Sequence, residues 1–179
     1  MKQQPLTLVT DRKTVVLREL ITPADDVAYF EAVQESPSHV DNYLNEVASK
    51  YDSLEKVRDR RLNTGDDIRM GIWDGNNFTG SIRAHIEEGN LTQAEIGYWL
   101  RESATGHGYT RLAIRALTKY IQPKFSRVFA EVHPDNAPSI KALIGSEYSQ
   151  VDTVERQWSG ETVKALVFEP VLIPAEHSL

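Results

Sequence analysis

One stretch of the chain constrains its topology more than any other. Between residues 93 and 132, an extended segment, a glycine turn, an amphipathic helix and a second extended segment follow one another. The two predicted strands are Gln93–Leu100 and Arg127–Val132. The helix between them, about Tyr109–Gln122, has one apolar stripe and ends at Pro123. Such a unit makes a right-handed crossover between parallel strands, which predicts an α/β (α+β) fold.

Shorter patterns surround this unit. Asp74-Gly75-Asn76-Asn77 is typical of a hairpin turn, and Thr22 is a good helix N-cap. No repeat or long linker divides the chain, so we expect one domain over residues 1–179, with a core of about 14–169 and a loose C-terminal tail. We expect further strands at 14–20, 68–73, 78–87, 149–158 and 161–169, and helices at 23–34, around 40–47, at 54–63 and after Asn136.

Composition narrows the class of protein. The 179 residues include no cysteine, which excludes disulfides, thiolate metal sites and a cysteine nucleophile. The net charge of −6, without a basic stripe, argues against a nucleic-acid partner; it fits a cationic small molecule or basic peptide, and it equally serves solubility. No signal peptide or membrane-spanning run is visible, so we expect a cytoplasmic protein with no membrane partner. His39, His85 and His133 lack ligand spacing, so we expect no metal.

The glycine turn is the strongest functional signal in the residues themselves. Gly106 and Gly108 lack side chains and lie between a strand end and a helix start, where backbone N–H groups converge. That arrangement suits a phosphate or diphosphate. The spacing is not the dinucleotide fingerprint, because Arg111 stands at the third glycine position, and no Gly-Lys-Ser/Thr of a Walker loop follows.

Three segments together resemble the GNAT N-acetyltransferase superfamily, and within it the ribosomal-protein N-terminal acetyltransferase (RimJ/RimL-like) branch. They are Ala94–Leu100, Gly106–Tyr109 and His133–Leu143. The resemblance implies a mixed, splayed sheet flanked by helices, acetyl-CoA as donor, and an amine as acceptor. The family's Gln/Arg-x-x-Gly-x-Gly/Ala motif corresponds to Ser103–Gly108, with serine replacing the leading Gln/Arg, and the usual Gly-Phe after the last helix reads Glu147-Tyr148.

The resemblance also implies roles for single residues. Glu95 becomes the candidate base for the incoming ammonium, directly or through water, and Ser139 the group that stabilises the departing thiolate. The strand that carries Glu95 has a bulge in the family. The implied cofactor-binding residues are Trp99, Leu100, Thr105, Gly106, His107, Gly108, Tyr109, Thr110 and Asn136.

Each role has a structural alternative. Glu95 also reads as a solvated or salt-bridged strand residue, and Ser139 as a residue that bonds to its own helix start. Asn136 is first of all a helix cap, His107 a loop residue that faces water, and Trp99 a core or pocket-wall residue.

The sequence leaves the acceptor open among a protein N-terminus, a polyamine and an aminoglycoside. The segment Pro37–Tyr51 is a candidate for part of the acceptor site, with packing as its alternative. A catalytically weakened acetyl-CoA-binding module and a purely structural α/β domain are the competing interpretations. A homodimer through the terminal hairpin is compatible with the sequence, which does not require it.

Overall fold

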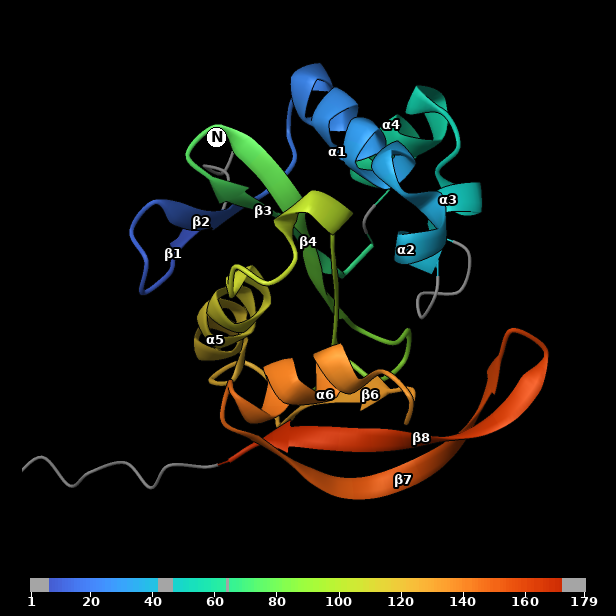
Figure 1. Ribbon diagram of the computed structural model, residues 1–179. Helices are drawn as coiled ribbons and strands as arrows, with labels where there is room; N and C mark the ends of the chain where they lie inside the picture. The colour runs from blue at the N-terminus through green and yellow to red at the C-terminus, as the bar shows by residue number, and fades with distance from the viewer. Residues whose placement is uncertain (1–6, 42–46, 64, 172–179) are drawn as a thin grey trace, which may run out of the picture.

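The computed structural model describes residues 7–41, 47–63 and 65–171, and these form one eight-stranded sheet in the order β1-β2-β3-β4-β5-β6-β8-β7 (Figure 1). Neighbouring strands are antiparallel, except that β5 and β6 are parallel and flank helix α5. The predicted crossover is therefore confirmed. The strands are β1 (Thr7–Val9), β2 (Val15–Arg18), β3 (Ile68–Asp74), β4 (Asn77–His85), β5 (Gln93–Leu100), β6 (Arg127–Val132), β7 (Tyr148–Trp158) and β8 (Glu161–Pro170).

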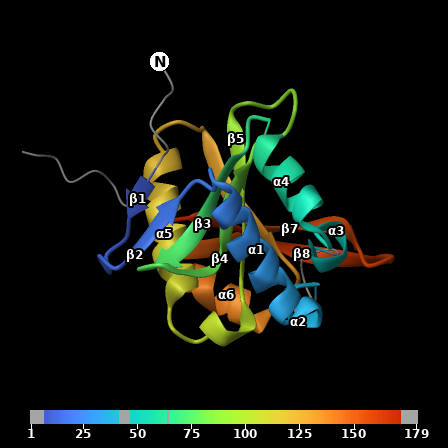
Figure 2. The same ribbon diagram turned by 90° about the horizontal axis from the view of Figure 1, so that it is seen from above.

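Helices cover both sides of the sheet. One group of helices gathers on one side and a second group on the other, as Figures 1 and 2 show together. No helix within the described ranges has both the length and the apolar character needed to cross a membrane. The first group is α1 (Pro23–Glu35), α2 (Pro37–Asp41), α3 (Val47–Lys50) and α4 (Leu54–Leu62); the second is α5 (Tyr109–Ile121) and α6 (Ala137–Ile144); a 3-10 turn, η1 (Glu102–Ala104), precedes α5.

Local sequence signals account for most of these boundaries. Thr22 caps α1 as predicted: its Oγ1 accepts from the Asp25 N–H at 3.2 Å, while the Asp25 carboxylate accepts from the Thr22 N–H at 2.9 Å. Strand β1 was not predicted, because three residues at a sheet edge carry too short a pattern. Tyr43, Leu44 and the tail beyond residue 171 lie outside the described residues.

Each face of the sheet has its own apolar core. The core under α5 and α6 includes Ile82, Ile96, Ile114 and Leu143, each at most 2 % exposed. The core under α1, α3 and α4 is aromatic, and Tyr29 at its centre is 1 % exposed. Alternation along β4 and β5 sends successive side chains to opposite faces, so each strand contributes to both cores.

Strands β5 and β6 run together for only three residue pairs. The last pair is Glu95–Phe129, and beyond it the two strands separate. On its other edge, β5 stays paired with β4 from Glu95 to Leu100 without a register shift. The bulge implied by the family resemblance is therefore absent from this pairing, and the splayed sheet is present.

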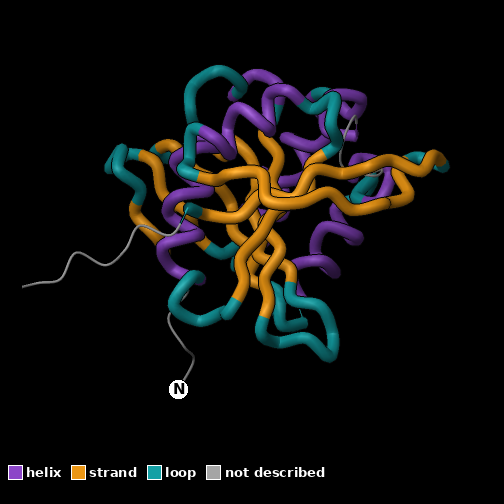
Figure 3. The backbone as a smooth tube through the Cα atoms, turned by 90° about the horizontal axis from the view of Figure 1, so that it is seen from below, coloured by secondary structure: helices purple, strands orange, loops and turns teal. Residues whose placement is uncertain are grey.

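The last two strands form a long hairpin that extends away from the rest of the molecule (Figure 3). β8 pairs with β6 only from Leu166 to Phe168, so the distal part of the hairpin is a two-stranded ribbon. Ser159 and Gly160 make its turn with positive φ, as their place in the sequence predicted. A homodimer that pairs through this hairpin stays a prediction.

Candidate functional site

The separation of β5 and β6 opens a cleft of about 750 Å³, here called the β5–β6 cleft. One wall is the second half of β5, the other is the end of β6, and the N-termini of α5 and α6 close it. Its lining includes Ile96–Leu100, Thr105–Gly108, Thr110, Arg111, Ala130–His133, Asn136, Pro138, Ser139, Lys141, Ala142 and Trp158. Most of the predicted cofactor-binding residues thus come together in one place.

The glycine turn forms one end of this cleft and offers open backbone. Gly106 and Gly108 have φ of +79° and +80°, and a Cβ on either would meet no atom within 4 Å. Among the described residues, no acceptor takes the backbone N–H groups of residues 106–111. Because Gly108 is the N-cap of α5, these donors sit at the positive end of the helix dipole. The turn therefore presents open backbone donors; that these donors bind a phosphate stays a prediction.

Side chains of the turn hold its shape. The His107 Nδ1 lies 2.8 Å from the Thr105 carbonyl oxygen, and the His107 ring stacks on Tyr109 at 5.8 Å. The Tyr109 hydroxyl donates to Asp74 Oδ2 at 2.8 Å, which ties the start of α5 to the β3–β4 hairpin. Tyr109 is the one residue of the turn that does not line the cleft, so its side chain anchors the turn while its backbone N–H stays in the open run.

A pair of hydroxyls lies deeper in the cleft. The Tyr98 hydroxyl and Ser139 Oγ are 2.6 Å apart and hydrogen-bonded. Asn136 caps α6 by accepting from the Ser139 N–H at 3.1 Å, so the Ser139 hydroxyl turns into the cleft and not to the helix start. Burial raises the pKa of the Tyr98 phenol to about 12, which keeps it protonated.

Glu95 lies on the opposite face of β5 from Tyr98. It is paired across the sheet with His85, and it is two residues from Gly97 on the same face. It lines neither the β5–β6 cleft nor the smaller cavity described below, and it forms no hydrogen bond or ion pair with a described residue. Burial, and then the charge of Glu131, raise the pKa of the Glu95 carboxyl. Glu131 is itself held by Arg156 through two hydrogen bonds of 2.6 and 2.7 Å.

Trp99 and Leu100 lie where β4 and β5 come unusually close. A Cβ on Gly80 would stand 2.2 Å from the Trp99 carbonyl oxygen and 2.8 Å from the Leu100 Cα. Only glycine permits this approach. The Trp99 ring packs edge-on against Tyr29, with centroids 5.2 Å apart, so the predicted pocket-wall role of this residue matches its position.

A second cavity, of about 260 Å³, lies on the face covered by α1, α3 and α4. We call it the Arg60 cavity. It shares Gly97, Tyr98 and Trp99 with the β5–β6 cleft, so the two hollows meet at the gap between β5 and β6. Its lining is Tyr29, Val47, Lys50, Tyr51, Arg60, Ser81, Arg83, Gly97, Tyr98 and Trp99, which includes the end of the predicted acceptor segment.

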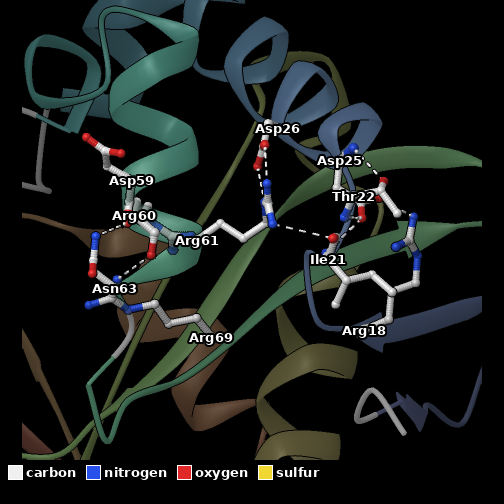
Figure 4. A network of polar contacts seen from close by, with 10 residues as sticks. All are labelled: Arg18, Ile21, Thr22, Asp25, Asp26, Asp59, Arg60, Arg61, Asn63 and Arg69. Carbon is white, nitrogen blue, oxygen red and sulfur yellow. Dashed lines mark hydrogen bonds and ion pairs between the residues drawn. The ribbon is translucent and has the colours of Figure 1, made fainter. Parts of the chain in front are cut away.

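Helix α4, which carries Arg60, is tied to α1 by the ion pair between Arg61 and Asp26 (Figure 4). The Arg61 guanidinium donates to both carboxylate oxygens of Asp26, at 2.7 and 2.9 Å. Next to it, Arg18 donates to Asp25 at 2.8 Å. A bidentate pair between α4 and α1 sets the position of the helix, and with it the position of Arg60.

Comparison with known proteins gives the same result as the geometry. The model of the acetyltransferase (GNAT) domain matches residues 14–145. The chain belongs to this acetyltransferase family. A comparison with curated proteins gives no significant match.

Solved structures resemble the acetyltransferase over most of its length. A RimL ribosomal L7/L12 α-N-protein acetyltransferase in complex with coenzyme A has a TM-score of 0.79 at 18% identity, covering 92% of this chain and 98% of that one. The microcin C7 self-immunity acetyltransferase MccE, in complex with acetyl-CoA and AMP, has a TM-score of 0.76 at 14% identity, covering 88% of this chain and 92% of that one. The acetyltransferase from Salmonella typhimurium that modifies the N-terminal serine of L7/L12 has a TM-score of 0.73 at 20% identity, covering 91% of this chain and 96% of that one. These likenesses show that the fold is the GNAT fold.

The acetyltransferase accommodates both departures from the family motif. The Ser103 N–H donates to Glu35 Oε1 at 2.9 Å. Hydrogen bonds from Arg101 first, and then from Ser103, lower the pKa of Glu35 to about 2. This contact ties the motif's first residue to the end of α1. Glu147 adopts φ of +67°, a conformation that favours glycine, and the following Tyr148 is buried.

Sequence reasoning gave no role to three polar residues that line the cleft: Tyr98, Arg111 and Lys141. The alternation of β5 was enough to place Tyr98 on the face opposite Glu95. The contact between Tyr98 and Ser139, 41 residues apart, had no sequence signal.

Proposed function

We propose that the protein transfers the acetyl group of acetyl-CoA to a primary amine. The observation that carries the proposal is the meeting of two hollows, one from each face of the sheet, at Gly97–Trp99 where β5 and β6 separate. Two reactants that enter from opposite sides reach the same gap. Holding them together supplies much of the acceleration of a two-substrate reaction.

The β5–β6 cleft fits coenzyme A. Its open N–H groups at residues 106–111 match the acceptor oxygens of a diphosphate, and Arg111 and Lys141 add positive charge nearby. The similar RimL and MccE structures contain coenzyme A and acetyl-CoA, respectively. Acetyl-CoA supplies the thioester acetyl group, and the unpaired edge of β5 offers backbone groups to its arm.

Glu95 accepts the proton of the incoming amine. Since Glu95 lines neither the β5–β6 cleft nor the Arg60 cavity, the proton travels through water in this proposal, one of the two routes left open by the sequence. The neutral amine nitrogen forms the new N–C bond as the C–S bond of the thioester breaks. The raised pKa makes Glu95 a stronger base than an ordinary carboxylate, because its pKa lies closer to the pH at which the reaction runs.

Ser139 stabilises the departing sulfur. Tyr98 stays protonated, and its hydroxyl lies 2.6 Å from Ser139 Oγ. In this proposal Tyr98 is the donor of that hydrogen bond, which leaves the Ser139 proton to point toward the thiolate. Coenzyme A leaves as the thiolate, and the proton that the nitrogen loses when the N–C bond forms passes through water to that thiolate. Ser139 is thus a hydrogen-bond donor and not a strong acid, in keeping with the high pKa of an alcohol.

The test is release of free thiol from acetyl-CoA in the presence of a panel of amines. Glu95→Gln and Ser139→Ala are expected to lower kcat by about a hundredfold or more, and to change the Kd of acetyl-CoA by less than about threefold. The exposed residues Glu161 and Ser149 give matched controls, Glu161→Gln and Ser149→Ala, which should behave as wild type.

Three results would contradict parts of the proposal. Normal turnover of both variants would remove the roles of Glu95 and Ser139. Acetyl-CoA binding without thiol release from any amine would favour a weakened binding module. No protection against thermal unfolding by millimolar acetyl-CoA would leave a structural domain, because a ligand that binds only the native state must stabilise it.

A further inference from the structure

Three cationic side chains from three separate elements line the Arg60 cavity: Lys50 of α3, Arg60 of α4 and Arg83 of β4. No aspartate or glutamate is among the described residues of this lining. The chain as a whole carries a net charge of −6, so the local charge is opposite to the average. A cavity with this charge repels an ammonium group unless something negative accompanies it.

Arg60 is held in place without a carboxylate partner. Its guanidinium lies over the Tyr29 ring at 4.6 Å and near the Tyr51 ring at 5.6 Å, and it forms no ion pair with a described residue. Arg61, its neighbour on α4, is instead neutralised by Asp26 (Figure 4). The rings orient the Arg60 cation and leave its N–H donors available for a ligand.

Arg83 and Lys50 extend this positive lining toward the gap. The Arg83 Nε would lie 3.3 Å from a Cβ on Gly97, so it reaches across β5 at the point where the two hollows meet. The Lys50 Nζ lies 5.8 Å from the Tyr51 ring centroid. Neither side chain forms an ion pair with a described residue.

We infer that the amine acceptor carries an anionic group, a carboxylate or a phosphate, which Arg60, Lys50 and Arg83 bind while the amine faces the gap at Gly97. This inference rests on the proposed function. The cavity has room for about nine water-sized volumes, enough for a small amino acid or the first residue of a peptide. Polyamines and aminoglycosides, which carry several positive charges, are excluded from it by repulsion.

The cations also favour chemistry at the amine. A nearby positive charge lowers the pKa of an ammonium, because it disfavours the protonated form. Glu95 lies on the same face of β5 as Gly97, two residues before it. The cations thus anchor the anionic group of the acceptor, and Glu95 takes the proton of its amine through water.

The test compares amines matched in size and different in charge. β-Alanine and its neutral amide form one pair, O-phosphoethanolamine and ethanolamine a second, and the peptide amides Ser-Glu-Ala and Ser-Gln-Ala a third; putrescine is the dication. Each is assayed for kcat/KM by thiol release, and for Kd by calorimetric titration of the coenzyme A-loaded protein. At least one anionic member is expected to exceed its neutral partner by about tenfold in both. The pair with the largest ratio distinguishes carboxylate, phosphate and acidic peptide.

Variants locate the preference. Arg60→Gln and Lys50→Gln should each bring the anionic-to-neutral ratio toward one, without changing the Kd of acetyl-CoA. Arg58→Gln removes the same charge from an exposed position of α4 outside the cavity, and should keep the ratio. Lys50 is exposed, so its variant tests the idea even if Arg60→Gln is unstable.

The readouts separate this inference from the proposed function. If neutral amines or putrescine release thiol as fast as their anionic partners, or faster, the inference is overturned and the proposed function stands. If the anionic amines bind tightly and selectively but release no thiol, the proposed function is overturned and the inferred anion site stands. Neither binding nor turnover with any amine would overturn both.

Discussion

The β5–β6 cleft and the Arg60 cavity meet at Gly97, yet they are built from different parts of the chain. The cleft presents backbone N–H groups from a turn of six consecutive residues. The cavity presents side chains from α1, α3, α4, β4 and β5. A backbone site depends on local conformation, and a side-chain site depends on how distant elements pack. The two are therefore expected to respond to different substitutions.

The largest expected effect breaks both hollows at once. In Gly80→Ala the new Cβ meets the backbone at Trp99 and Leu100, which cannot move without separating β4 from β5. We expect a loss of about 3 kcal/mol in the free energy of unfolding, measured by denaturant titration. In the control Gly97→Ala, the Cβ meets only the flexible Arg83 side chain, so stability should hold within about 1 kcal/mol. Equal stability of the two variants would contradict the close approach at Gly80.

The next effect separates the cleft from the cavity. Gly106→Val places a branched side chain where the protein leaves open space, and should block a diphosphate at the turn. We expect the Kd of acetyl-CoA to rise about thirtyfold, near 2 kcal/mol, while the Kd of the preferred amine stays within about twofold. Gly89→Val is the matched control, since Gly89 also has positive φ and open surroundings but lies outside the cleft. A similar loss of affinity in the control would mean that backbone strain, and not contact with the ligand, is the cause.

A smaller effect concerns the motif departure at Glu147. Its φ of +67° costs a non-glycine residue about 1 kcal/mol, and its exposed ion pair with Arg115 at 3.2 Å returns only part of that. Glu147→Gly is therefore expected to raise the free energy of unfolding by somewhat less than 1 kcal/mol, measured by thermal unfolding. Glu155→Gly, at an exposed strand position, should instead destabilise. Destabilisation of both would show that Glu147 is not strained.

The smallest effect concerns proton transfer on the face of the Arg60 cavity. A carboxylate base works only when ionised, so activity should fall as the pH drops through the raised pKa of Glu95. Glu131→Gln removes one cause of that rise, so the acid limb of the pH profile of kcat should move to lower pH. The gain below the midpoint should be less than about tenfold. An unmoved acid limb would contradict the assignment of Glu95.

The sequence predicted the cleft far better than the cavity. Gly106, Gly108 and the cap Asn136 act through local backbone geometry, which adjacent residues encode, and all three lie in the cleft as expected. The splay of β5 and β6 followed only from the family resemblance. Arg60 and Arg83 are 23 positions apart and appear in the sequence as ordinary surface cations. Their convergence depends on the packing of α4 against α1, which no local pattern encodes.

The net charge was the weaker guide for the same reason. The net charge of −6 fitted a cationic acceptor, whereas the described residues of the Arg60 cavity contribute three cations. At ordinary salt, screening limits the reach of an exposed charge to about 10 Å. The charges that line a cavity therefore affect a bound ligand more than the net charge of the chain does.

The separate cores on the two faces have an evolutionary consequence. Substitutions in distant, unshared contacts add nearly independently, so changes among α1, α3 and α4 leave the packing beneath α5 and α6 largely intact. Under the proposed function, substitutions in one layer would therefore change the choice of acceptor, while the acetyl-CoA site on the other layer stays intact.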